Sequence, residues 1–169
     1  SKSKVYGNPD PHLVTRRSGE SGAPNSHTIC GMTMTPRVAK KLNIAVIGAG
    51  FISDYHVAGL KAAGATNISV LVGRSPEKTR KRADVLGIPK TSTDYHAVLA
   101  DPAIDAVVIA TPDATHHQMA LDALQAGKAT LLQKPMAMNS NECRDILAMT
   151  KTVAVPLTVS FMHRYFPEI

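Results

Sequence analysis

A short apolar strand that runs directly into a glycine-rich turn is the feature that most constrains this sequence. Residues 42–47 are almost all apolar, and Gly48 and Gly50 follow them just before a stretch of helical character. Gly48 permits a tight turn, and Gly50 lets the backbone approach a pyrophosphate, which the N-terminal N–H groups of the helix then hold. The pattern predicts a dinucleotide site with contacts from both glycines, Phe51 and Ile52, and an ordinary glycine turn is the alternative.

Short apolar runs alternate with helical stretches from residue 42 onward, which is the pattern of βαβ units on a parallel sheet. The runs are apolar on both faces, as expected of strands that are covered on both sides. We therefore predict an α/β fold, a doubly wound parallel sheet of Rossmann type. We expect strands at 42–47, 68–72, 106–110, 130–132 and 157–161, a weaker strand at 88–91, and helices at 51–63, 76–86, 115–126 and 140–151.

The first 40 residues are rich in Ser, Gly, Pro, Asn and Arg and show no hydrophobic period, so we predict a disordered basic tail at 1–40. Residues 1–41 hold seven of the 19 Lys and Arg but two of the 13 acids, so this segment carries most of the net charge of +6. A nucleic-acid binder is the alternative that this charge raises. Because the remainder of the chain is nearly neutral, we expect no nucleic-acid partner.

The apolar runs and the cysteine count argue against a membrane protein and against a disulfide-rich or metal-cluster protein. No uninterrupted apolar run approaches the roughly 18 residues that a membrane helix needs. The two cysteines are too few for a disulfide framework or a metal cluster. We expect no membrane partner, no metal and a cytoplasmic location.

The end of the second expected strand lacks the acidic residue that accepts hydrogen bonds from the adenosine ribose in NAD-binding proteins. Arg74 and Ser75 follow this strand instead. A guanidinium and a hydroxyl suit a 2′-phosphate through charge-assisted hydrogen bonds, whereas a carboxylate would repel it. We therefore predict NADP as the cofactor, with NAD as the alternative. The basic residues that come next, Arg80, Lys81 and Arg82, are expected to form a solvated helix face.

Polar groups also follow two later strands of the expected sheet. Ligands gather at the carboxyl ends of the strands in doubly wound sheets, near the point where the strand order reverses. The ammonium of Lys134 is expected at the same edge as the dinucleotide, and further cofactor contacts are expected from Thr111, Pro112 and Asp113.

The order of short motifs along the chain resembles that of one family. Residues 110–116 read Ala-Thr-Pro-Asp-Ala-Thr-His, residues 126–128 read Ala-Gly-Lys, and residues 133–135 read Gln-Lys-Pro. This series resembles the Ala-Thr-Pro-Asn, His, Ala-Gly-Lys and Glu-Lys-Pro series of the glucose-fructose oxidoreductase, inositol dehydrogenase and rhizopine catabolism family. Residues 160–167 also resemble the segment that leads toward the family's second domain. The likeness runs from residue 42 to the end of the chain.

The resemblance implies that the chain is the N-terminal NAD(P)-binding domain of an oxidoreductase. Lys134 would then be catalytic and lie beside the nicotinamide and the reacting hydroxyl, and cofactor contacts would extend to His116, Gln133 and Arg164. Gln133 and Asp113 stand where the family usually has Glu and Asn. An amide can still hydrogen-bond the nicotinamide ribose, and a carboxylate can still accept from it, so neither departure abolishes the expected site.

The resemblance also implies a domain plan and an activity. Residues 41–162 would form the dinucleotide-binding domain, and residues 163–169 would begin the connection to a substrate domain that this chain lacks. The implied activity is hydride transfer between a nicotinamide cofactor and a sugar, polyol or related hydroxy compound, in a full-length protein that can form homo-oligomers. A non-catalytic dinucleotide-binding regulatory module and an inactive fragment are the alternatives.

Overall fold

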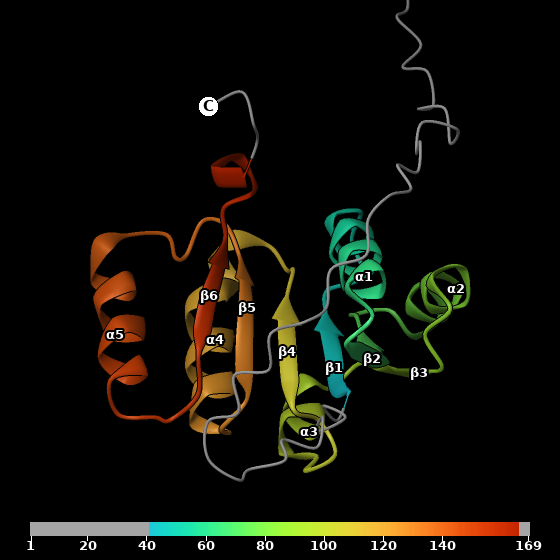
Figure 1. The fold of residues 1–169 in the computed structure, drawn as a ribbon, viewed down its shortest axis with the longest axis horizontal. Helices are drawn as coiled ribbons and strands as arrows, with labels where there is room; N and C mark the ends of the chain where they lie inside the picture. Colours follow the sequence, from blue (N-terminus) through green and yellow to red (C-terminus); the bar gives the residue numbers. More distant parts are fainter. Residues whose placement is uncertain (1–40, 166–169) are drawn as a thin grey trace, which may run out of the picture. The chain divides into compact units, whose positions relative to one another are not determined.

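A six-stranded, wholly parallel sheet organises the chain. The computed structural model describes residues 41–165, and the predicted disordered tail at 1–40 lies outside these residues. The strand order is β3-β2-β1-β4-β5-β6 (Figure 1), so it reverses between β1 and β4. The strands are β1 Leu42–Ile47, β2 Thr66–Val72, β3 Lys90–Ser92, β4 Ala106–Ile109, β5 Ala129–Gln133 and β6 Leu157–Ser160. The predicted doubly wound Rossmann sheet is confirmed.

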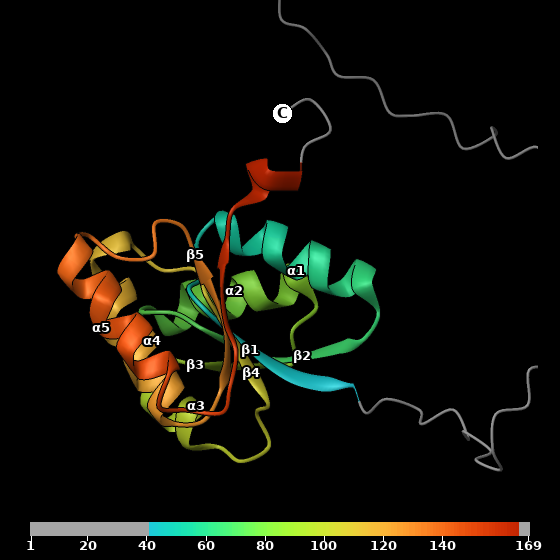
Figure 2. The same ribbon diagram turned by 60° about the vertical axis from the view of Figure 1, so that its left-hand side comes forward.

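Helices cover the sheet on both faces. Helices α1 and α2 lie on one face, and α3, α4 and α5 lie on the other (Figure 2). The helices are α1 Ile52–Ala63, α2 Pro76–Leu86, α3 Tyr95–Ala100, α4 His116–Gln125 and α5 Ser140–Thr150, with short 3-10 turns at Asp113–Thr115 and Met162–Tyr165. Every predicted strand and helix is present with its ends displaced by at most two residues, whereas α3 was not predicted.

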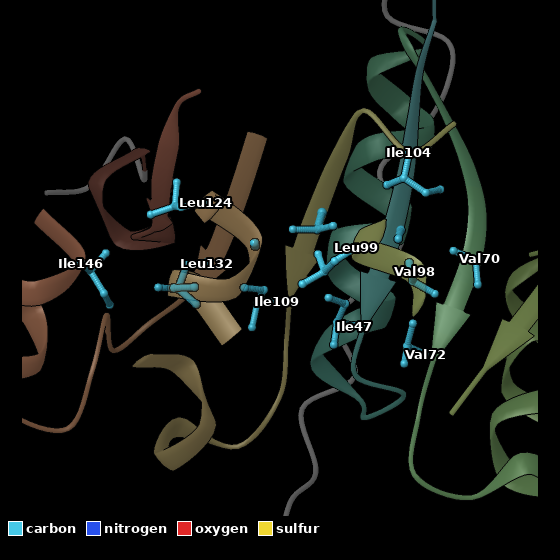
Figure 3. Close-up of a cluster of buried hydrophobic side chains, with 14 of the residues drawn as sticks. Ile47, Val70, Val72, Val98, Leu99, Ile104, Ile109, Leu124, Leu132 and Ile146 are labelled. Atoms are coloured by element: carbon cyan, nitrogen blue, oxygen red, sulfur yellow. The ribbon is translucent and has the colours of Figure 1, made fainter. Parts of the chain in front are cut away.

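The central strands are apolar at successive positions because they contribute to two cores. Adjacent residues of a strand point to opposite faces of the sheet. In β1, Val46 packs in the core under α1 and α2, and Ile47 packs in the core under α3, α4 and α5 (Figure 3). In β4, Val108 likewise packs in the core under α1 and α2, and Ile109 packs in the core under α3, α4 and α5. This double burial holds the carboxyl ends of β1 and β4, and the loops that follow them, in a fixed arrangement.

The ends of the helices are fixed by local hydrogen bonds and by glycine. The Ser75 side chain accepts a hydrogen bond from the backbone N–H of Lys78 and caps α2, with Pro76 as the first helical residue. Gly64 and Gly87 adopt left-handed conformations that end α1 and α2. Among residues 41–165, no helix is long and apolar enough to cross a membrane.

Candidate dinucleotide-binding site

The turn between β1 and α1 is held tightly against both neighbouring strands. Gly48 has a φ of +117°, and its N–H donates to the carbonyl of Val72 over 2.9 Å. A Cβ at this position would lie 2.2 Å from the carbonyl oxygen of Ala110. The buried hydroxyl of Ser53 donates to the carbonyl of Gly48 over 2.7 Å and anchors the turn to the first turn of α1. Only glycine fits at residue 48.

Gly50 differs from Gly48 because it faces open space. A Cβ at Gly50 would meet no atom within 4 Å. The α1 helix has no side-chain cap, and no hydrogen bond among the described residues uses the backbone N–H of Phe51 or Ile52. The positive end of α1 and two free donors therefore lie beside a glycine whose Cβ position is open. This arrangement fits a pyrophosphate group.

Gly73, directly after β2, supports the candidate site through its packing and was not among the residues predicted from the sequence. A Cβ there would lie 2.3 Å from Thr79 Oγ1 and 2.9 Å from the Cβ of Ala49. The glycine thus lets α2 and the turn after β1 pack against the end of β2. The available signal was a glycine placed directly after a strand and close to a second glycine turn.

Three basic residues of α2 are paired, whereas Arg74 forms no ion pair with the described residues. Arg80 pairs with Asp84, Lys81 pairs with Glu77 at 2.7 Å, and Arg82 pairs with Asp54 of α1. Lys81 belongs to a solvated face, as predicted, because its side chain is 75% exposed. Arg82 is less exposed and links α2 to α1.

Arg74 itself is exposed directly after β2, and its side chain forms no ion pair with any described residue. Ser75, beside it, is half-buried and caps α2. The structure therefore leaves the Arg74 guanidinium available at the carboxyl edge of the sheet, on the side where β2 ends.

The loop after β4 places two exposed residues and one buried residue near the switch point. Pro112 and Asp113 are exposed, and the half-buried Thr111 accepts a hydrogen bond from the hydroxyl of Thr115 over 2.7 Å. His116 begins α4 and has no exposed surface. Its Nδ1 lies 2.6 Å from the carbonyl oxygen of Pro135, and its Nε2 lies 3.0 Å from the carbonyl oxygen of Thr111.

The loop after β5 carries Lys134 at the same edge. Gln133 is only 6% exposed, and its Oε1 accepts a hydrogen bond from the backbone N–H of Lys134 over 2.8 Å. The Lys134 side chain is exposed and forms no ion pair with the described part of the chain. Arg164 lies in the 3-10 turn after β6, and its side chain is also exposed.

The predicted contacts therefore fall at the carboxyl ends of five strands of the sheet, with Arg164 after β6. The glycine turn follows β1, Arg74 follows β2, the Thr111 loop follows β4, and Lys134 follows β5 (Figure 1). Ligands of doubly wound sheets lie outside these carboxyl ends, at the point where the strand order reverses. A glycine turn and an open helix N-terminus at that point define a dinucleotide-binding Rossmann domain.

The chain belongs to the glucose-fructose oxidoreductase, inositol dehydrogenase and rhizopine catabolism family. The family's profile, described as an oxidoreductase family with an NAD-binding Rossmann fold, matches residues 42–161. The resemblance found in the motif series is thereby confirmed, and the chain is an NAD-binding oxidoreductase domain of this family.

Individual relatives include inositol dehydrogenases. The chain is 36% identical over 132 residues to scyllo-inositol 2-dehydrogenase (NAD(+)) of Bacillus subtilis, covering 75% of this chain and 37% of that protein. It is 32% identical over 128 residues to inositol 2-dehydrogenase/D-chiro-inositol 3-dehydrogenase of Lactiplantibacillus plantarum, covering 74% and 37%. The chain therefore spans about 37% of the length of these curated relatives.

A solved structure shares the fold. Levoglucosan dehydrogenase, in complex with NADH and levoglucosan, matches with a TM-score of 0.71 at 27% identity, covering 73% of this chain and 35% of that chain. The likeness is restricted to one part of that longer protein, as it is for the curated relatives.

Proposed function

We propose that this chain binds NADP(H) in preference to NAD(H) and forms the cofactor-binding half of a dehydrogenase for a sugar, polyol or related hydroxy compound. The open N-terminus of α1 beside Gly50 is the observation that carries the dinucleotide part of this proposal. The substrate class rests on the relatives, which are named as inositol and levoglucosan dehydrogenases.

The pyrophosphate would lie against the first turn of α1. The N–H groups of Phe51 and Ile52 would donate to its oxygens, and the absence of a side chain at Gly50 would allow close approach. Gly48 would act indirectly, because it holds the turn against β2 and β4. The nicotinamide half would extend over the ends of β4 and β5, toward Thr111, Pro112, Asp113, Gln133, Lys134 and Arg164.

The preference for NADP rests on Arg74. Its guanidinium is exposed and forms no ion pair with the described residues, so it can pair with a 2′-phosphate without first losing another partner. The Ser75 hydroxyl can donate to the same phosphate while its oxygen caps α2. The Bacillus subtilis relative is named for NAD(+), so the proposed preference would differ from the cofactor in that relative's name.

Lys134 would be the catalytic residue. The nicotinamide supplies the hydride acceptor when the cofactor is bound. The Lys134 ammonium would hydrogen-bond the substrate hydroxyl, orient its C–H bond and help to move the hydroxyl proton as the alcohol is oxidised. Because Lys134 forms no ion pair with the described residues, its three N–H donors are available for this contact.

A titration with both reduced cofactors tests the proposal. The fluorescence of NADPH and of NADH is followed as the chain is added, for the wild type, for Arg74→Ala and for Lys81→Ala. We expect tighter NADPH binding by the wild type and a loss of about tenfold in Arg74→Ala for NADPH alone, the equivalent of one charge-assisted hydrogen bond.

Lys81→Ala is the matched control, because it removes the same charge from the neighbouring helix, where Lys81 pairs with Glu77. It should leave the ratio of the two affinities unchanged. Equal or tighter binding of NADH by the wild type would overturn the NADP preference. Binding of neither cofactor would overturn the proposed function of this chain.

A further inference from the structure

His116 lies between two loops of the proposed site, and its ring has no exposed surface. The ring is fully buried, and its nitrogens contact the carbonyls of Thr111, after β4, and Pro135, after β5. Among the described residues, no other side chain has polar atoms within hydrogen-bonding distance of both loops. Any effect of His116 on a bound cofactor must therefore pass through the backbone.

The chemistry of the two contacts makes the ring a donor. A carbonyl oxygen only accepts hydrogen bonds, so a contact of 2.6 Å between Nδ1 and the Pro135 oxygen requires a proton on Nδ1. Nε2 faces a second carbonyl, that of Thr111, at 3.0 Å. The stronger hydrogen bond of the ring is thus to Pro135, in the loop that bears Lys134.

The backbone of Lys134 is consequently held on both sides. Its own N–H donates to Oε1 of the buried Gln133, and the carbonyl of the next residue, Pro135, accepts from His116. The Lys134 side chain itself is exposed and has no ion-pair partner among the described residues. The two hydrogen bonds to the backbone, rather than contacts of the side chain, therefore fix the position from which the Lys134 side chain extends.

We propose that His116 is a positioning residue, which fixes Lys134 relative to the loop after β4 and so shapes the nicotinamide half of the site. This inference rests on the proposed function. It assigns His116 a role different from direct cofactor contact. The adenosine half, at the ends of β1 and β2, has no hydrogen bond to His116 and should be independent of it.

The test compares NADH with ADP-ribose, which lacks the nicotinamide. Both ligands have a free 2′-hydroxyl, so the comparison does not depend on the NADP preference. The affinity of each for the whole chain is measured by calorimetry, for the wild type and for His116→Gln, which keeps a donor but cannot span both carbonyls. We expect His116→Gln to weaken NADH binding by about tenfold, the equivalent of one hydrogen bond, and to leave ADP-ribose binding within about twofold.

Two further variants sharpen the test. His117→Ala is the matched control, because the adjacent imidazole contacts Asp145 at 3.3 Å and neither loop, and both affinities should be unchanged. Gln133→Met releases the N–H of Lys134 from the other side, and if His116→Gln fails to fold, an unchanged NADH affinity in Gln133→Met overturns the inference.

Each remaining outcome overturns the inference. Equal losses for NADH and ADP-ribose would show that His116 has a purely structural role. Unchanged NADH binding in both His116→Gln and Gln133→Met would show that the two hydrogen bonds to the backbone do not matter. Failure of the wild type to bind ADP-ribose would instead identify a failure of the proposed function itself, and the positioning role would fall with it.

Discussion

Replacing Gly48 by alanine should destabilise the fold as well as the site. Two separate costs arise from the same added methyl group. The φ of +117° lies in a region that side chains rarely adopt, and holding a residue there costs about 1–3 kcal/mol. The new Cβ would also lie 2.2 Å from the carbonyl oxygen and 2.6 Å from the carbonyl carbon of Ala110, and relieving such a contact typically costs about 1–3 kcal/mol.

The two costs together lower the free energy of unfolding by about 4 kcal/mol, a large part of the roughly 5–15 kcal/mol that stabilises a typical domain. The contact cannot be relieved by rotating a side chain, because both neighbouring atoms belong to the backbone of Ala110. The turn after β1 or the end of β4 would have to move. Urea unfolding followed by circular dichroism measures the change.

Gly59→Ala is the control for this prediction. Gly59 lies within α1, and a Cβ there would meet no atom within 4 Å, so the substitution should stabilise the chain by about 0.5–1 kcal/mol. The reasoning is refuted if Gly48→Ala unfolds within about 0.5 kcal/mol of the wild type, a change typical of a neutral surface substitution.

Two further predictions concern polar groups that support the fold. Lys128, 7% exposed, donates to the carbonyls of Asp101 and Ile104. Lys128→Met should lower the free energy of unfolding by about 1–3 kcal/mol, because the Ile104 carbonyl loses its donor while that of Asp101 keeps the N–H of Ile104. The exposed Lys151→Met should change it by less than about 0.5 kcal/mol. An unfolding free energy for Lys128→Met equal to that of Lys151→Met would contradict this. Burial and the hydrogen bond to Asp122 raise the pKa of Tyr95 to about 12 from 10.0, so its contribution to stability should be complete below pH 10 and decline as the pH rises toward 12. Tyr95→Phe should lower the free energy of unfolding by about 1 kcal/mol at neutral pH and should make stability less dependent on pH above 10. Melting temperatures that fall equally steeply with pH in the wild type and in Tyr95→Phe would contradict this prediction.

The strands and most helices could be predicted because their signals are local. Apolar runs with glycine or proline at their ends mark buried strands and helix boundaries, and Pro76 and Gly87 bound α2 as expected. The six-residue α3 was missed because it is too short for a helical period to emerge. Its only local signal is Asp94, whose side chain accepts hydrogen bonds from the N–H groups of His96 and Ala97.

The site was predicted in part, because some of its features depend on contacts between distant segments. The proposed role of Gly50 follows from a local strand–turn–helix pattern. The tight packing of Gly73 against Thr79 and Ala49 depends on how α2 meets the first turn. His116 was predicted as a cofactor contact, and its link to Pro135, 19 residues away, could be recognised only once β4 and β5 were side by side.

Gly50→Ala tests most directly the claim that a dinucleotide lies against the N-terminus of α1. No atom lies within 4 Å of the added Cβ, and the backbone of Gly50 is not left-handed, so the free energy of unfolding should stay within about 1 kcal/mol of the wild type. The methyl group would occupy the space proposed for the pyrophosphate. We predict that NADPH titration shows an affinity at least about tenfold weaker than that of the wild type, a loss of about 1.4 kcal/mol. Undiminished NADPH binding by a normally folded Gly50→Ala variant would contradict the account.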